Sequence, residues 1–242
     1  MGKVVVLISS KGGSGKSTVA VGLATAFSLE HKRVLLIDAD EGARCLDTML
    51  AVDENTVFDL NDVVMGNVDY KDAMLKVPSM DNVWVIPSPL NNEPIDLFKL
   101  GQLSEEMCKD FDYVIIDTKG QLPFERLKVL PKTALFISVV TTDRIAVRNT
   151  GVLVSGLHSC GIVPRLIINR FKKKGSDGRF NNIDKIIDTS YAQLIGVVPE
   201  DKNISLSVGP IVLGTAAAAI FRIAARIEGN QVKLRKIKNI IS

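Results

Sequence analysis

The chain has 242 residues, of which 46% are hydrophobic, 24% charged and 5% aromatic. The length fits one large domain or two small ones, and the composition favours a sizeable buried core over a disordered chain. No run of about 18 apolar residues occurs, which excludes a membrane-spanning helix. Cys45, Cys108 and Cys160 form no CxxC or CxC pair, which disfavours disulfides and a self-contained metal site. The beginning of the chain lacks a signal-peptide pattern, so we expect a cytoplasmic protein.

The formal net charge of +3 is unevenly distributed along the chain. The last fourteen residues, 229–242, contain no acidic residue, and their basic residues are Lys233, Arg235, Lys236 and Lys238. The remainder has 26 basic and 27 acidic side chains, a net charge of −1. The basic character therefore lies in the tail.

Short apolar runs rich in β-branched residues predict strands at 3–9, 33–39, 82–88, 112–118, 134–140, 164–170 and 194–200. Helical patterns cover 16–30, 95–109, 143–158, 181–191 and 214–229, the last closed by glycine. This alternation predicts an α/β fold: a mostly parallel central sheet with helices on both faces. We expect a single domain at 1–229, followed by a basic amphipathic tail at 230–242.

A glycine-rich segment, SSKGGSGKSTVA (9–20), follows the first predicted strand and opens the first predicted helix. Its residues Gly15, Lys16 and Ser17 match the end of the phosphate-binding pattern GxxxxGK[ST]. In that pattern backbone N–H groups surround phosphate oxygens, and the helix N-terminus adds positive potential. This predicts a P-loop NTPase, with Lys16 on the β- and γ-phosphates and Ser17 on Mg²⁺. The nucleotide contacts predicted here are Gly12, Gly13, Ser14, Gly15, Lys16, Ser17 and Thr18.

The stretch KGGSGKS (11–17) resembles the deviant phosphate loop KGGxGK[ST] of the MinD/ParA family of ATPases. The resemblance implies a homodimer in which Lys11 crosses the interface to the partner's nucleotide, while Lys16 acts in its own subunit. A second cation stabilises charge on the transferred phosphoryl group, as an arginine finger does. Catalysis would then depend on ATP-driven dimerisation. The implied cofactors are ATP or ADP and Mg²⁺, and ATP rather than GTP follows from the resemblance alone.

Two later strand ends carry acidic residues. Asp38 and Asp40 in IDADEGARCLD (37–47) share a face because they lie two residues apart. The stretch is similar to DADxGxRxLD of MinD-like proteins, which implies that Asp38 supports the Mg²⁺ shell and that catalytic Asp40 orients the attacking water. Asp117 in YVIIDTKGQLP (113–123) matches the Walker B pattern, whose carboxylate holds Mg²⁺.

The residues after Asp117 depart from the resemblance. MinD-like proteins usually read DSPAG, whereas this chain reads DTKGQ (117–121). Gly120 still allows a backbone N–H to approach the γ-phosphate, but Lys119 stands where a small or rigid residue is usual. We expect Lys119 to alter the movement of the switch, the rate of hydrolysis or the surface that an activator binds.

The stretches LIINR (166–170) and VVPED (197–201) resemble the strand end and the loop that surround the base in this family. The nucleotide-binding residues implied there are Asn169, Arg170, Pro199 and Glu200. An amide both donates and accepts hydrogen bonds, so Asn169 can pair with adenine. Capping of the strand end is the alternative for this asparagine.

The tail QVKLRKIKNIIS (231–242) predicts a helix with Leu234, Ile237 and Ile241 on one face and basic residues on the other. Basic amphipathic helices bind anionic membrane surfaces, and MinD proteins end in a similar helix. This predicts a peripheral protein on the inner face of the cell membrane, held more strongly by the two tails of one dimer. Packing of the tail on its own domain is the alternative.

The leading hypothesis is a MinD-like ATPase whose dimer positions other proteins, as in division-site selection, and whose slow hydrolysis an activator or partner protein would accelerate. The first alternative is a ParA-like DNA-partitioning ATPase, with the basic loop RFKKKGSDGRF (170–180) on DNA phosphates. A metallocentre-assembly ATPase and a nucleotide-binding scaffold with little turnover are the others.

Overall fold

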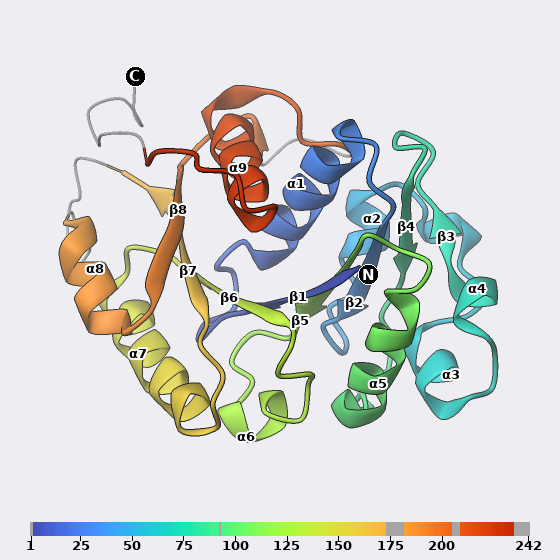
Figure 1. The fold of residues 1–242 in the computed structure, drawn as a ribbon. Helices are drawn as coiled ribbons and strands as arrows, with labels where there is room; N and C mark the ends of the chain where they lie inside the picture. The colour runs from blue at the N-terminus through green and yellow to red at the C-terminus, as the bar shows by residue number, and fades with distance from the viewer. Residues whose placement is uncertain (1, 92, 173–181, 205–208, 235–242) are drawn as a thin grey trace.

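The computed structural model describes residues 2–91, 93–172, 182–204 and 209–234. Within them, eight strands form one sheet in the order β3-β4-β2-β5-β1-β6-β7-β8 (Figure 1). The strands are β1 (Lys3–Ile8), β2 (Val34–Ala39), β3 (Leu75–Lys76), β4 (Val83–Ile86), β5 (Tyr113–Thr118), β6 (Leu135–Val140), β7 (Arg165–Phe171) and β8 (Gln193–Pro199). All pairs are parallel except β3 with β4. The predicted, mostly parallel α/β sheet is confirmed.

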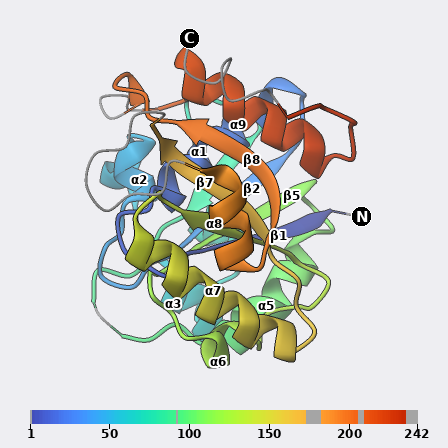
Figure 2. The same ribbon diagram turned by 90° about the vertical axis from the view of Figure 1, so that its left-hand side faces the viewer.

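Helices cover both faces of this sheet (Figures 1 and 2). They are α1 (Lys16–Leu29), α2 (Leu46–Met49), α3 (Leu60–Met65), α4 (Tyr70–Ala73), α5 (Leu97–Met107), α6 (Phe124–Leu127), α7 (Arg144–Ser159), α8 (Ile183–Ser190) and α9 (Gly214–Ile227). Helices α1, α2 and α9 lie on one face, and α3 to α8 lie on the other. A one-turn 3₁₀ helix, η1 (Asp53–Asn55), follows α2.

The central strand β1 explains why the strand runs are continuously apolar. Val5 and Leu7 pack with α1 and α9, whereas Val6 and Ile8 pack with the helices of the opposite face. Because both faces are covered, neither set of alternate positions can be polar. Helix α1 is buried between the sheet and α9, and Gly22 allows this close approach, since a Cβ there would lie 2.8 Å from Ile220 Cδ1.

The strand register brings the acidic strand ends together. In the parallel pairs, Asp117 of β5 lies opposite both Asp38 of β2 and Leu7 of β1. The carboxyl ends of β1, β2 and β5 therefore meet at one edge of the sheet, where the segment 9–15 joins β1 to α1. This edge is where parallel α/β sheets bind ligands.

Some elements differ from the prediction. The seven predicted strands are present, but β3, a two-residue edge strand, was missed because so short a segment has no periodic pattern. The predicted tail helix would begin at residue 231, yet residues 231–234 form no helix. Arg226 of α9 accounts for this, because it donates to the carbonyl oxygens of Val232 (2.8 Å) and Lys233 (3.0 Å). Residues 235–242 lie outside the described residues. Among the described helices, none is long and apolar enough to cross a membrane.

Candidate active site

The loop between β1 and α1 is held in a curled conformation. Gly13 (φ 73°) and Gly15 (φ 86°) occupy the left-handed region that favours glycine. Ser9 Oγ donates to the Lys11 carbonyl (3.0 Å), and Ser10 Oγ donates to a carbonyl of α7 (2.9 Å). The first turn of α1 contains no acidic side chain, so its N-terminus keeps its positive potential. The predicted phosphate loop thus has the conformation that suits an anion.

Lys16 and Asp117 meet beneath this loop. The Lys16 side chain is only 6% exposed, and its Nζ lies 3.8 Å from Oδ1 of the fully buried Asp117. Among the described residues, no donor reaches either carboxylate oxygen of Asp117 with good hydrogen-bond geometry, although the Ser17 hydroxyl is near enough to lower its pKa. Burial raises the pKa of Asp117 to about 7, although the Lys16 ammonium acts in the opposite direction. A buried carboxylate so poorly paired suits a divalent cation, and Mg²⁺ prefers such oxygen ligands.

Asp38 anchors the loop that follows β2. Its Oδ2 accepts from the N–H groups of Cys45 (2.9 Å) and Leu46 (3.0 Å), and its Oδ1 accepts from that of Asp40 (3.1 Å). Burial raises the pKa of Asp38 in spite of these bonds. The sequence did not reveal this structural role, and the predicted role in the Mg²⁺ shell stays a prediction.

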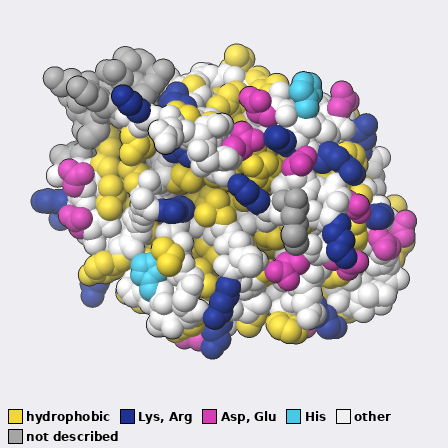
Figure 3. All heavy atoms as spheres, viewed as in Figure 1, with side chains coloured by type: hydrophobic (Ala, Val, Ile, Leu, Met, Phe, Trp, Pro, Cys, Tyr) yellow, Lys and Arg dark blue, Asp and Glu magenta, His cyan; other side chains and the backbone are white. Residues whose placement is uncertain are grey.

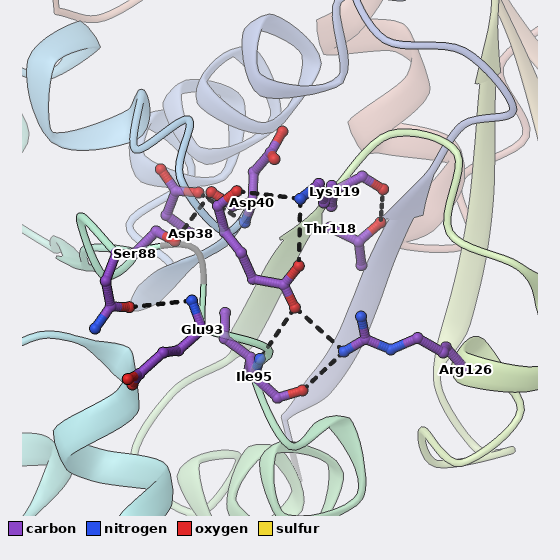
Figure 4. Close-up of polar contacts among 10 residues, drawn as sticks. Asp38, Asp40, Ser88, Glu93, Ile95, Thr118, Lys119 and Arg126 are labelled. Carbon is purple, nitrogen blue, oxygen red and sulfur yellow. Dashed lines mark hydrogen bonds and ion pairs between the residues drawn. The ribbon is translucent and has the colours of Figure 1, made fainter.

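Asp40 lies between two lysines. It is half-buried, and burial raises its pKa while the charges of Lys16 and Lys119 lower it. Figure 4 shows Asp40 beside Lys119. The predicted catalytic carboxylate therefore shares one site with Lys16, and its proposed action on water stays a prediction.

The predicted Mg²⁺ ligand Ser17 has a cysteine neighbour. Cys45 Sγ donates to Ser17 Oγ at 3.2 Å, and burial raises the pKa of the Cys45 thiol to about 12, so the group stays a thiol. Cys108 and Cys160 lie at the C-terminal ends of α5 and α7, and all three cysteines are free. No cluster of three or more metal-ligating His, Cys, Asp or Glu side chains occurs within the described ranges.

Asn169 contacts the phosphate loop directly. Its Nδ2 donates to the Ser14 carbonyl (2.8 Å), and its Oδ1 accepts from the Arg170 N–H (3.0 Å). A Cβ at Gly15 would lie 2.3 Å from the Asn169 amide nitrogen, so glycine is required there for space as well as for conformation. The asparagine thus supports the loop, and its contact with a base stays a prediction.

Two adjoining hollows open beside this asparagine. One, of about 310 Å³, is lined by Thr18, Asn169, Arg170, Pro199 and Glu200 among others. The other, of about 240 Å³, is lined by Lys11, Gly12, Gly13 and Ser14 and shares Arg170 and Glu200 with the first. All four residues predicted around the base therefore line one hollow, and the phosphate loop lines its neighbour.

Lys11 differs from Lys16 in its surroundings. Its side chain is 53% exposed, and its Nζ lies 3.6 Å from Oδ1 of Asp143, the N-cap residue of α7. An exposed ion pair of this kind contributes at most about 1 kcal/mol. Lys11 can therefore leave Asp143 at small cost.

The sequence did not reveal the contacts of Glu41. Lys119 and Arg126 form ion pairs with this buried carboxylate, and the Ile95 N–H donates a hydrogen bond to it. Figure 4 labels these three partners. Glu41 follows Asp40 in the sequence, but no local pattern indicates its partners, which come from distant segments.

The basic loop and the tail are only partly described. Lys172 forms an ion pair with Glu200, and residues 173–181, with most of the basic loop, lie outside the described residues. On the face drawn in Figure 3, Lys and Arg side chains are interspersed with Asp and Glu side chains. Arg226 also donates to the Ile195 carbonyl of β8 (2.8 Å), so the beginning of the tail is fixed beside this edge strand.

Comparisons with known proteins identify the family of the chain. Residues 5–209 match the family described as the CobQ/CobB/MinD/ParA nucleotide binding domain. The septum site-determining protein MinD of Bacillus subtilis (strain 168) is 29% identical, over 98% of this chain and 93% of that protein.

Solved structures of relatives are also similar. A chain of the MinC:MinD cell division protein complex of Aquifex aeolicus has a TM-score of 0.84 and 29% identity, over 97% of this chain and 99% of that one. The septum site-determining protein MinD of Pyrococcus horikoshii OT3, complexed with Mg-ADP, has a TM-score of 0.81 over 94% of this chain and 96% of that one. At 24% sequence identity, this similarity supports the fold alone.

Proposed function

Because the chain belongs to the CobQ/CobB/MinD/ParA nucleotide-binding family, we propose that it is a MinD-like ATPase that hydrolyses ATP to ADP and phosphate with Mg²⁺. The observation that carries this proposal is the buried pair of Lys16 and Asp117 beneath a glycine-rich loop. Asp117 has no well-formed hydrogen bond within the described part of the chain, so Mg²⁺ would supply the positive charge that its buried carboxylate lacks.

In this proposal each part of the site has one task. The N–H groups of residues 12–17 and the Lys16 ammonium bind the β- and γ-phosphates, and the hollow beside Asn169 receives the base. Asp117 and Ser17, with Asp38 in support, would hold Mg²⁺, which would neutralise charge on the phosphate oxygens. Asp40 holds and orients the attacking water.

Lys11 would complete the site only in a dimer. Its exposed ammonium is weakly held by Asp143, so the pair can open when a second subunit docks. Lys11 would then contact the partner's nucleotide, as a finger supplied in trans does. Hydrolysis would thus require the dimer and return it to monomers, which makes the protein an ATP-dependent switch.

The proposed task of this switch is protein positioning at the inner membrane surface, as in the choice of a division site. The Bacillus subtilis relative is a septum site-determining protein, and the Aquifex aeolicus relative is part of a complex with MinC. We infer that a MinC-like partner binds the dimer. The basic tail 231–242 would supply membrane affinity, with about 1 kcal/mol from each basic side chain near an anionic surface and a gain in effective concentration from two tails.

The ATPase proposal is tested by phosphate release from Mg²⁺·ATP. We expect turnover in the natural chain, loss of at least about a hundredfold in Lys16→Ala, and no change in Lys71→Ala, a matched control. Lys71 is an exposed lysine of α4 that pairs with Asp110. Equal turnover in all three proteins, or none in any, would refute the proposal.

The membrane proposal is tested separately by co-sedimentation with anionic liposomes in ATP, ADP or no nucleotide. A chain ending at Gly229 is the control. Pelleting that requires both ATP and the tail is the expected result. If no state pellets, the tail does not bind membranes, and retention on DNA becomes the next assay, with Lys172 to Lys174 as the first residues to replace.

A further inference from the structure

A buried carboxylate joins three segments beside the candidate active site (Figure 4). The Glu41 side chain is only 5% exposed, and its Oε1 accepts from the Ile95 N–H (3.0 Å) and from Arg126 Nη2 (3.2 Å). Its Oε2 lies 3.7 Å from Lys119 Nζ. A buried carboxylate with three donors around it has a fixed position, because loss of any donor leaves charge poorly compensated.

Lys119 ties the segment after β5 to the end of β2 in two further ways. Its backbone N–H donates to the Ala39 carbonyl (3.2 Å), and its Nζ donates to the Glu41 carbonyl (3.4 Å). Two residues further on, the Gln121 N–H donates to the Ser9 carbonyl (2.9 Å). The segment 118–121 is therefore held between the loop that follows β2 and the phosphate loop.

The segment also packs tightly on the phosphate loop. A Cβ at Gly120 would lie 3.1 Å from the Gly12 Cα. Asp40, the proposed water-orienting residue, directly precedes Glu41, and its carbonyl accepts from Ser88 Oγ (3.0 Å). The loop that carries Asp40 and the segment that carries Gly120 thus both border the place where a nucleotide's phosphates would bind.

We propose that Lys119 is a positioning residue whose pair with Glu41 clamps the Asp40 loop to the Gly120 segment, so that the two meet the nucleotide as one unit. The clamp acts on the rate of hydrolysis more than on nucleotide affinity, because it aligns groups around the phosphates without binding them. The expected effect on kcat rests on the proposed ATPase function. The contacts that form the clamp are present without nucleotide, so the clamp itself can be tested without hydrolysis.

The kinetic test compares Lys119→Met, Glu41→Gln and the double variant. Lys119→Met and Glu41→Gln are each expected to lower kcat about tenfold with KM within about twofold, because misplacement of aligned groups slows chemistry. The double variant is expected to be no slower than the slower single variant, because each single replacement already removes the pair between Lys119 and Glu41. Lys119→Arg keeps the charge and should restore most of kcat. The proposal would be overturned if the losses of kcat in the two single variants multiplied in the double variant. It would also be overturned if the single variants changed KM alone.

A second test needs no hydrolysis. Amide hydrogen exchange in the nucleotide-free protein should become about fivefold faster in both segments, 40–46 and 118–121, in Lys119→Met, since the two segments lose a shared interaction. Lys71→Met, which breaks a surface ion pair of α4, should leave both unchanged. Lys119 is 43% exposed, so its replacement leaves the core intact.

The two tests separate the clamp from the ATPase proposal. Unchanged exchange, or faster exchange in only one segment, contradicts the clamp whatever the turnover. Faster exchange in both segments in a chain without ATPase activity supports the clamp and refutes the proposed function.

Discussion

Replacement of Asp117 by asparagine should affect the free and the ligand-bound protein in opposite directions. Without a ligand, the buried carboxylate has no well-formed hydrogen bond among the described residues, and the one cation beside it there is Lys16, at 3.8 Å. Asp38 and Asp40 are close enough to raise its pKa further, and the Ser17 hydroxyl lowers it. Asparagine has a similar shape and no charge. We therefore expect Asp117→Asn to stabilise the nucleotide-free protein and to remove the extra stability that Mg²⁺·ATP gives.

The magnitude follows from the pKa of Asp117, which burial raises from 3.8 to about 7. At pH 8 the ionised group costs the folded protein about 4 kcal/mol, at about 1.36 kcal/mol for each pKa unit. The unpaired buried amide costs about 1–3 kcal/mol in turn. The net gain is about 2 kcal/mol, or a melting temperature about 4–8 °C higher for a chain of this length.

The same pKa fixes the sign of the pH dependence. Between about pH 4 and pH 7, the folded protein holds a proton on Asp117 that the unfolded chain has lost. Stability from this group is therefore greatest below the unfolded pKa and falls as the pH rises through the folded pKa. The difference in stability between the natural chain and Asp117→Asn should change across this window and be constant above it.

Thermal melting from pH 5 to pH 8, with and without Mg²⁺·ATP, measures both effects. Asp81→Asn is the matched control, because Asp81 is exposed in the turn before β4. A nucleotide-free Asp117→Asn that melts below the natural chain at pH 8 would refute the account of this site. Equal stabilisation of both proteins by Mg²⁺·ATP would do the same.

Three more outcomes follow from the geometry. Lys11→Ala should bind ATP with the affinity of the natural chain, as calorimetry would measure, yet turn over about a thousandfold more slowly. Unchanged turnover would show that Lys11 does not act in catalysis. Gly15→Ala should lower the free energy of unfolding by about 2–3 kcal/mol, because the left-handed backbone is strained and the Asn169 amide is displaced. Denaturant titration measures this loss, and unchanged stability would contradict the 2.3 Å distance between the added Cβ and Asn169 Nδ2. Arg226→Ala should release the beginning of the tail, so that amide hydrogens of residues 230–234 exchange faster while those of α9 stay protected. Unchanged exchange at residues 230–234 would show that other contacts hold this segment.

The strands were predictable from the sequence because most are covered on both faces and read as continuous apolar runs. The short helices were not. For example, α6 has four residues, Phe124–Leu127, and a single turn shows no helical periodicity. The two-residue strand Leu75–Lys76 exists because it pairs with β4 at the sheet edge, which is a tertiary cause.

The site was predictable where one motif or one strand end carries the chemistry. Asp38 and Asp117 are in neighbouring strands, so their approach follows from the order of a parallel sheet. Contacts that join distant segments were not predictable. Asn169 reaches the phosphate loop across 155 residues, and Arg126 reaches Glu41 across 85. No local pattern encodes such pairs, since they depend on how the loops pack.

The central claim is that ATP converts the protein from monomer to dimer and that hydrolysis reverses the change. The most direct measurement is the molar mass by light scattering of an Asp40→Ala variant, in which the proposed water-orienting carboxylate is absent, with Mg²⁺·ATP and with Mg²⁺·ADP. We expect a dimer of about twice 26.3 kDa in ATP and a monomer in ADP. The same mass in both nucleotides would contradict it.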